Sequence, residues 1–148
     1  MNPYRLHASL GYNLSLAARL QERRLDDALK TLDLTRTTWC ILLAVGNEGL
    51  TQPSDIATFV GIDRTATSRA LRTMETAGLI EREAGRRDRR TTTVSLTDLG
   101  VQRIAQGTPY AVQNNALMRR KLGTEDYGHL VTLLERLTEG ESAGLSVF

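Results

Sequence analysis

Arginine residues are concentrated in one short part of this chain of 148 residues. From Arg64 to Arg90 there are eight arginines and four acidic residues, an excess of four positive charges, although the whole chain carries a formal net charge of only +2. A guanidinium group is planar and donates parallel hydrogen bonds, which suits phosphate oxygens and the edge of guanine. A local positive excess on a balanced chain is the electrostatic pattern of a nucleic-acid-binding surface.

The first group of these arginines falls within a predicted pair of helices. Pro53 begins a short helix, a position where its missing N–H costs nothing, and Gly61 ends it. Asp63 caps a second helix over residues 64–77, which stops at Gly78. Two short helices joined by a glycine-containing turn predict a helix-turn-helix.

The outward face of this second helix carries the polar side chains, because an apolar stripe faces the other way. We predict that this face enters a DNA major groove, where Arg69 contacts guanine and Arg72 contacts phosphate. Thr65 and Ser68 are expected to contact thymine methyls or nearby phosphates. The predicted DNA-binding residues of the helix are Arg64, Thr65, Ser68, Arg69 and Arg72.

The second group of arginines forms the tip of a predicted hairpin, the wing. Strands expected over residues 79–83 and 91–96 flank a loop that reads Gly85-Arg86-Arg87-Asp88-Arg89-Arg90. We predict that Arg90 and one of Arg86, Arg87 and Arg89 reach the minor groove and favour A·T-rich flanks. Asp88 would repel phosphate, so we expect it to hold a neighbouring arginine in a fixed fork geometry.

Four further helical segments complete the expected fold. Residues 4–31 read as one long helix or two short ones, and Thr37 is the expected N-cap of a helix that runs through Val45. After the hairpin, Thr97 or Asp98 caps a helix over residues 99–121, in which Gly107 and Pro109 imply a bend. A last helix opens at Thr124, and a short tail, 140–148, ends apolar.

The predicted fold class is mainly α with a small β-hairpin. We expect a winged helix-turn-helix at residues 35–100, flanked by an N-terminal dimerisation helix at 1–34 and C-terminal dimerisation helices at 101–148. The terminal helices have apolar faces that a small central domain cannot cover. A second copy of the chain is the favoured cover, giving a symmetric homodimer, and a monomeric bundle is the alternative.

Several motifs resemble the MarR family of bacterial winged-helix regulators. They are the helix start Asp63–Arg69, the segment Met74–Arg82, the wing sequence Asp88-Arg89-Arg90 and the run Leu96-Thr97-Asp98-Leu99-Gly100. The last two match the family's Asp-x-Arg and Leu-Thr-x-x-Gly signatures. Thr67 stands where the family typically has a hydrophobic residue, and we expect its hydroxyl to bond its own helix backbone.

The resemblance implies a homodimer that binds double-stranded DNA at a pseudo-palindromic operator and mostly acts as a repressor. It also implies release of DNA when a small aromatic, anionic or lipophilic effector enters a cleft between the dimer helices and the winged helix. Tyr12, Trp39 and Leu43 are the candidate ligand-binding residues, although burial in the core is favoured for Trp39.

The sequence gives little support for a disulfide, a metal site or an enzyme active site. Cys40 is the single cysteine, so neither an intrachain disulfide nor a cysteine-cluster metal site can form, and His7 and His129 stand far apart. No set of nucleophile and base and no phosphate-cradling loop appears, so we expect neither an enzyme nor a bound cofactor or metal.

Two alternative functions stay open. The first is a thiol-based redox switch through Cys40, although peroxide-sensing members of the family use a cysteine near the start of the first helix and residues 1–36 contain none. The second is a winged helix that contacts only proteins. No apolar run approaches the ~20 residues of a membrane span, and no signal peptide is evident, so a cytoplasmic protein without membrane partners is expected.

Overall fold

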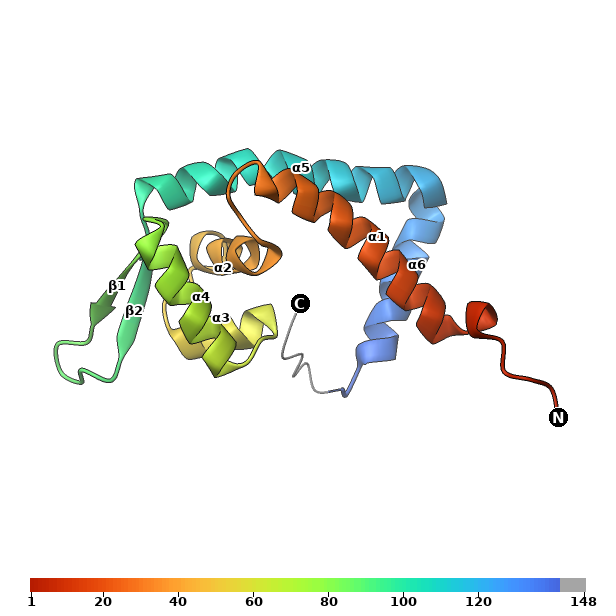
Figure 1. The fold of residues 1–148 in the computed structure, drawn as a ribbon, viewed down its shortest axis with the longest axis horizontal. Helices are drawn as coiled ribbons and strands as arrows, with labels where there is room; N and C mark the ends of the chain where they lie inside the picture. The colour runs from red at the N-terminus through yellow and green to blue at the C-terminus, as the bar shows by residue number, and fades with distance from the viewer. Residues whose placement is uncertain (142–148) are drawn as a thin grey trace.

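The structure, a computed structural model, describes residues 1–141, and the tail at 142–148 lies outside the described residues. In the described part the chain forms six α-helices, one 3-10 helix and one antiparallel hairpin, which confirms the predicted fold class (Figure 1). The elements are η1 (Leu6–Ala8), α1 (Leu10–Lys30), α2 (Arg36–Gly46), α3 (Pro53–Val60), α4 (Arg64–Thr76), β1 (Ile80–Ala84), β2 (Thr92–Leu96), α5 (Asp98–Leu122) and α6 (Thr124–Thr138).

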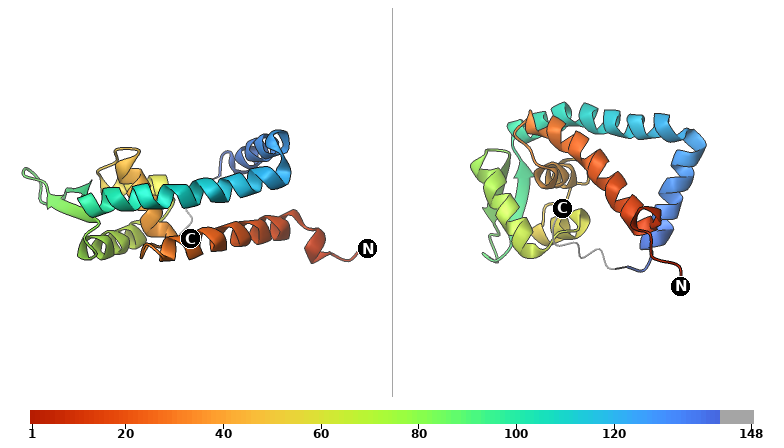
Figure 2. Two further views of the ribbon diagram at one scale, coloured as in Figure 1. Left: turned by 90° about the horizontal axis from the view of Figure 1, so that it is seen from above. Right: turned by 45° about the vertical axis from the view of Figure 1, so that its right-hand side comes forward.

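The long helix α5 links the two ends of the molecule. Helices α2, α3 and α4 and the hairpin gather at its N-terminal end, and α6 turns away from its C-terminal end (Figure 1). Helix α1 packs along α5, and Figure 2 shows the two helices side by side when the molecule is seen from above. The terminal helices therefore do not close into a bundle within one chain. Among residues 1–141, no helix combines the length and apolarity that crossing a membrane requires.

The hydrophobic core lies within the winged helix-turn-helix. It combines side chains of α2, α3, α4 and the hairpin with Leu29 from the end of α1. Trp39 of α2 is only 3% exposed, and its ring lies against Gly107 of α5, where a Cβ atom would come within 2.9 Å of Cη2. The fully buried large side chains are Leu29, Ile41, Leu42, Ile56, Leu71, Met74, Ile80 and Val94, together with Thr67.

The start of α2 differs from the prediction. Thr35, and not Thr37, is the N-cap, because Thr35 and Thr38 cap each other reciprocally. The Thr35 hydroxyl accepts from the Thr38 backbone N–H at 3.2 Å, and the Thr38 hydroxyl accepts from the Thr35 backbone N–H at 2.9 Å. This capping box satisfies two donors at once, which the single cap at Thr37 could not do.

The turn before α4 follows the predicted chemistry. Gly61 ends α3 in the left-handed conformation, with φ of 80°, which favours glycine. The Asp63 carboxylate then accepts from the Ala66 backbone N–H at 2.6 Å and begins α4. The two helices thus form the predicted helix-turn-helix.

The hairpin is fixed at its middle and at its base by three contacts. Arg82 of β1 faces Val94 of β2 in the antiparallel register, and the Val94 N–H donates to the Thr51 carbonyl at 2.8 Å. The Thr97 hydroxyl donates to the Gly78 carbonyl and accepts from the Gly100 N–H at 3.1 Å, capping α5. These bonds join the end of α4, the hairpin and the start of α5 at one corner.

The packing at this corner explains why the Leu-Thr-x-x-Gly motif ends in glycine. The Leu79 carbonyl approaches Gly100 so closely that a Cβ atom at position 100 would collide with it. Glycine therefore allows the first turn of α5 to pack on the segment that connects α4 to β1. The motif thus joins the helix-turn-helix and its hairpin to the long helix.

Polar contacts join α1 to the rest of the chain. Asn114 of α5 is only 8% exposed, and it donates to the Gln21 backbone carbonyl at 3.1 Å while accepting from Nε of Arg24 at 3.1 Å. Arg36 of α2 forms ion pairs with Glu22 at 2.7 Å and Asp26 at 2.8 Å. Helix α1 is therefore held by directional bonds to both α5 and α2.

Candidate nucleic-acid interface

Helix α4 presents one polar face to the surroundings. Its opposite face is buried through Thr67, Leu71 and Met74. The Thr67 hydroxyl donates to the Asp63 carbonyl at 2.8 Å, so this buried polar side chain is satisfied within its own helix, as expected from the sequence. The exposed side chains that line one shallow open hollow along the helix are Arg64, Thr65, Ser68, Arg69 and Arg72.

The wing arginines are all exposed at the tip of the hairpin. The loop between the strands is closed by the Gly85 N–H, which donates to the Thr91 carbonyl at 2.8 Å. A side chain at position 85 would collide with the Thr91 hydroxyl and come within 2.6 Å of the Asp88 carbonyl, so the tight turn requires glycine here. The exposed cations of the tip are Arg86, Arg87, Arg89 and Arg90.

Asp88 shapes the loop by a contact that differs from the expected fork. Its carboxylate accepts from the Arg90 backbone N–H at 3.0 Å, and its carbonyl accepts from the Thr91 hydroxyl at 2.7 Å. The Arg90 Nε lies 3.8 Å from the same carboxylate oxygen, with 95% of the Arg90 side chain exposed. Asp88 therefore holds the backbone beside Arg90 and leaves its guanidinium largely open to an incoming anion.

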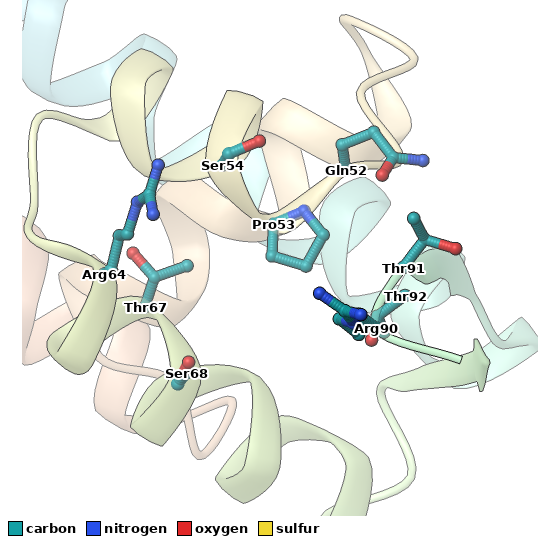
Figure 3. A pocket seen from close by; sticks show the side chains of 9 residues that line it. All are labelled: Gln52, Pro53, Ser54, Arg64, Thr67, Ser68, Arg90, Thr91 and Thr92. Carbon is teal, nitrogen blue, oxygen red and sulfur yellow. The ribbon is translucent and has the colours of Figure 1, made fainter. Parts of the chain in front are cut away.

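A groove separates the tip end of the wing from α3 and α4. Figure 3 shows Arg64 of α4 and Arg90 of the wing on opposite sides of this groove, with Pro53 between them. The N-terminal end of α3 also opens into it, where the helix dipole favours negative charge. The lining residues are Gln52, Pro53, Ser54, Arg64, Thr67, Ser68, Arg90, Thr91 and Thr92.

Sequence reasoning missed Gln52 and Ser54 as part of this surface. The available signal was Pro53, which marks the start of α3 and hence the N-terminal end of a helix. The groove brings one arginine of each predicted group together with that helix end. An arrangement of this kind can bind the phosphates that lie between a major and a minor groove.

Arg82 has a different environment from the other arginines of the cluster. Its Nε donates to Oε2 of Glu75 at 3.0 Å, and its Nη2 donates to the same oxygen. The hydrogen bonds from Arg82 hold the pKa of the Glu75 carboxyl below its ordinary value. Arg82 is thus engaged within the protein, between α4 and β1.

Of the three candidate ligand-binding residues, Trp39 and Leu43 are one turn apart on α2, and Tyr12 lies apart from them in a single chain. Trp39 is buried against Gly107, and Leu43 is half-buried beside the core. Tyr12 lies near the start of α1 and stacks on His7 with ring centroids 4.7 Å apart. At a rise of about 1.5 Å per residue, Tyr12 is roughly 25 Å along α1 from Leu29, which joins the core beside α2.

Cys40 is half-buried on α2. Burial raises the pKa of its thiol, and the nearby charge of Arg36 opposes that rise in part. The thiol is therefore protonated at neutral pH and a poor nucleophile. In the part of the chain that the structure describes, no group of three or more His, Cys, Asp or Glu side chains could hold a metal ion.

The helix pair, the hairpin and the long flanking helices define a protein of the winged helix-turn-helix fold class. Within that class, residues 32–91 match the model of the MarR family. Over this segment the chain is similar to the MarR family of winged-helix transcription regulators.

Three solved structures are similar along nearly the whole chain. BpsR of Bordetella bronchiseptica, whose DNA binding is regulated by 6-hydroxynicotinic acid, matches with a TM-score of 0.85 and 20% identity over 95% of this chain and 100% of that one. The transcriptional repressor CouR bound to a DNA duplex matches with a TM-score of 0.81 and 24% identity, covering 93% and 100% of the two chains. A MarR mutant from E. coli in complex with operator DNA matches with a TM-score of 0.82 and 21% identity, covering 93% of this chain and 99% of that one.

Proposed function

We propose that this protein binds double-stranded DNA as a homodimer at a pseudo-palindromic operator. In each protomer α4 enters the major groove, and the wing tip enters the adjacent minor groove. The observation that carries the proposal is the groove between Arg64 and Arg90, which joins the exposed face of α4 to the tip end of the wing. The fold is shared with CouR and MarR, whose structures were solved with DNA.

Binding is tested by selection from a library of random double-stranded oligonucleotides, followed by fluorescence anisotropy on the enriched duplex. We expect one enriched sequence with two half-sites about 34 Å apart, the repeat of one DNA turn. Affinity should fall steeply with salt because phosphate contacts release counterions. A lack of association with any duplex at low ionic strength would contradict the proposal and would favour a winged helix that contacts only proteins.

Two arginine variants separate the roles of helix and wing. Replacement Arg69→Ala should relax the choice of base within each half-site, at a cost of about 1–3 kcal/mol per half-site. Replacement Arg90→Ala should weaken binding and reduce the preference for A·T-rich flanks. The matched control Arg120→Ala removes the same charge from the far end of α5, and it should change neither preference. An unchanged flank preference in Arg90→Ala would show that the wing assignment is wrong.

We further propose that the protein is a repressor released by a small aromatic, anionic or lipophilic compound. Support comes from BpsR, which has the same fold and whose DNA binding responds to an aromatic acid. A thermal-shift screen against aromatic acids identifies a ligand, and the same ligand should then release the selected duplex. A reporter gene placed behind that duplex should be silenced by the protein and restored by the ligand. Activation of the reporter by the protein would overturn the assignment as a repressor.

A further inference from the structure

One salt bridge joins the recognition helix to the wing. Two nitrogens of Arg82, in β1, donate to one carboxylate oxygen of Glu75, near the C-terminal end of α4. In residues 1–141, no other side-chain hydrogen bond or ion pair connects α4 with the hairpin. Beyond the shared hydrophobic core, the polar side-chain contact between the two elements that carry the exposed arginines is therefore this pair.

The salt bridge lies at the border of the core. Arg82 shares the inner face of the hairpin with Ile80, which is 1% exposed, and stands opposite Val94, which is fully buried. The Arg82 side chain is 28% exposed and that of Glu75 is 39% exposed. Neither group faces outward like the wing arginines, so both are poorly placed to contact a phosphate. Glu81 lies beside Arg82 on the outer face of β1 and is exposed.

The wing tip lies well beyond this anchor. The hairpin is fixed at its base by the contacts of Thr97, and the salt bridge is formed halfway along β1, at the level of Val94 and its bond to Thr51. Arg86 is four residues past Arg82, which corresponds to about 13 Å of strand at 3.3 Å per residue. A small rotation of the hairpin about its base would therefore move the tip by several ångströms, which is comparable with the ~6 Å width of the minor groove.

We propose that Glu75 and Arg82 are positioning residues for DNA recognition. Their salt bridge sets the angle between the helix in the major groove and the wing in the minor groove, and so determines how strongly the flanks of the operator are read. The inference rests on the proposed function, but neither residue needs to touch DNA. It assigns to Arg82 a role distinct from that of the arginines exposed on the same surface.

The test compares two duplexes built on the enriched sequence, one with A·T flanks and one with G·C flanks. In Glu75→Gln the preference for A·T flanks should fall by about fivefold, which is near the lower end of what one base pair contributes to specificity. Arg82→Gln should lose the same preference, and the double variant should lose no more than either single variant, because both act through one bond. The preference for bases inside the half-sites, which α4 reads, should stay unchanged in all three.

Glu81→Gln is the matched control. It removes the same negative charge one residue from Arg82, so it should tighten binding to both duplexes equally and leave the flank preference intact. If Glu75→Gln behaves in the same way, the inference is overturned while the proposed function stands. If the wild-type protein enriches no sequence, the proposed function fails and the inference falls with it.

Circular dichroism shows whether each variant is folded. Should Glu75→Gln not fold, Arg82→Lys replaces it, since lysine keeps the charge but cannot present two nitrogens in a rigid fork. Loss of flank preference in Arg82→Lys with half-site preference retained supports the positioning role. An unchanged flank preference in that variant overturns it.

Discussion

At the scale of single residues, the role of each arginine depends on the groups that its guanidinium contacts. Arg36 pairs with two carboxylates of α1, and Arg82 bonds Glu75, whereas Arg90 is almost fully exposed. The pair of Glu75 and Arg82 is neutral, so the positive excess of the 64–90 segment survives their mutual engagement. What changes is which groups can receive a phosphate, namely the arginines on the outer face of α4 and at the wing tip.

The Glu75 carboxylate should make the stability of the winged helix depend on pH. Because Arg82 lowers its pKa in the folded state, Glu75 contributes stability above its unfolded pKa of about 4.3, and this contribution is lost as the pH falls through the lower folded value. Wild type should therefore resist urea better than Glu75→Gln at pH 7, and the two should converge in acid. Urea titrations from pH 7 to pH 3 measure this, and a difference that stays constant down to pH 3 would contradict it.

Cys40 should react slowly with thiol reagents at neutral pH. Burial raises the pKa of its thiol, so the reactive thiolate is scarcer than in a free cysteine. The rate of alkylation by iodoacetamide should rise as the pH increases above about 8.5, the ordinary pKa of cysteine, and unfolding in urea should abolish the protection. Peroxide-induced release of DNA that disappears in Cys40→Ser would instead establish the redox alternative.

At the scale of the elements, the sequence predicts those features that depend on local chemistry. The helix end at Gly61 and the cap at Asp63 were predicted from residue type. Glycine is favoured in the left-handed conformation that ends a helix, and an aspartate side chain can accept from the first N–H groups of the next helix. The start of α2 was misplaced because threonines at 35, 37 and 38 are equally good caps by type. Only the reciprocal bonds of Thr35 and Thr38 decide among them.

Features that depend on contacts between distant elements could not be read from the sequence. The Glu75–Arg82 pair spans a turn, and Arg82 is chemically identical to the arginines around it. Asn114 lies 93 residues from Gln21, to which it bonds, and a polar residue in the long helix reads as solvent-exposed. The groove beside Pro53 likewise depends on how the hairpin folds back toward α3 and α4.

The contact between α2 and α5 leads to a prediction at Gly107. A methyl group there would overlap the Trp39 ring, with 2.9 Å to Cη2 and 3.0 Å to Cε3. Gly107→Ala should therefore lower the free energy of unfolding by about 1–3 kcal/mol through overpacking, measured by urea denaturation. Replacement Trp39→Phe in the same protein removes the overlapping ring atoms and should recover part of the loss.

Gly11→Ala is the control for helix propensity. A Cβ atom at Gly11 in α1 meets nothing within 4 Å, so this change should raise stability by up to about 1 kcal/mol. If Gly107→Ala raises stability as Gly11→Ala does, the close approach of Trp39 to α5 is not tight enough to exclude a methyl group.

At the scale of the whole molecule, one chain leaves a large apolar surface open at the end opposite the wing. No residue of α6 is buried, and the exposed fraction of Leu133 is 54%. At about 1.5–3 kcal/mol per fully buried side chain, covering several such residues would offset the cost of association. The exposed apolar residues of α6 are Leu130, Val131, Leu133, Leu134 and Leu137.

A second copy of the chain is the expected cover, and Leu133→Glu tests it. In sedimentation experiments the wild type should have twice the chain mass of 16.4 kDa, and Leu133→Glu should shift it toward the monomer because a carboxylate would be buried at the interface. Affinity for the selected duplex should fall with the dimer, since a monomer holds only one half-site. Thr132→Glu introduces the same charge on the opposite face of α6 and should leave the dimer intact. If the wild type is monomeric, the apolar face of α6 does not form a dimer interface. The spacing between the α4 helices of two protomers could then not determine which operator is bound.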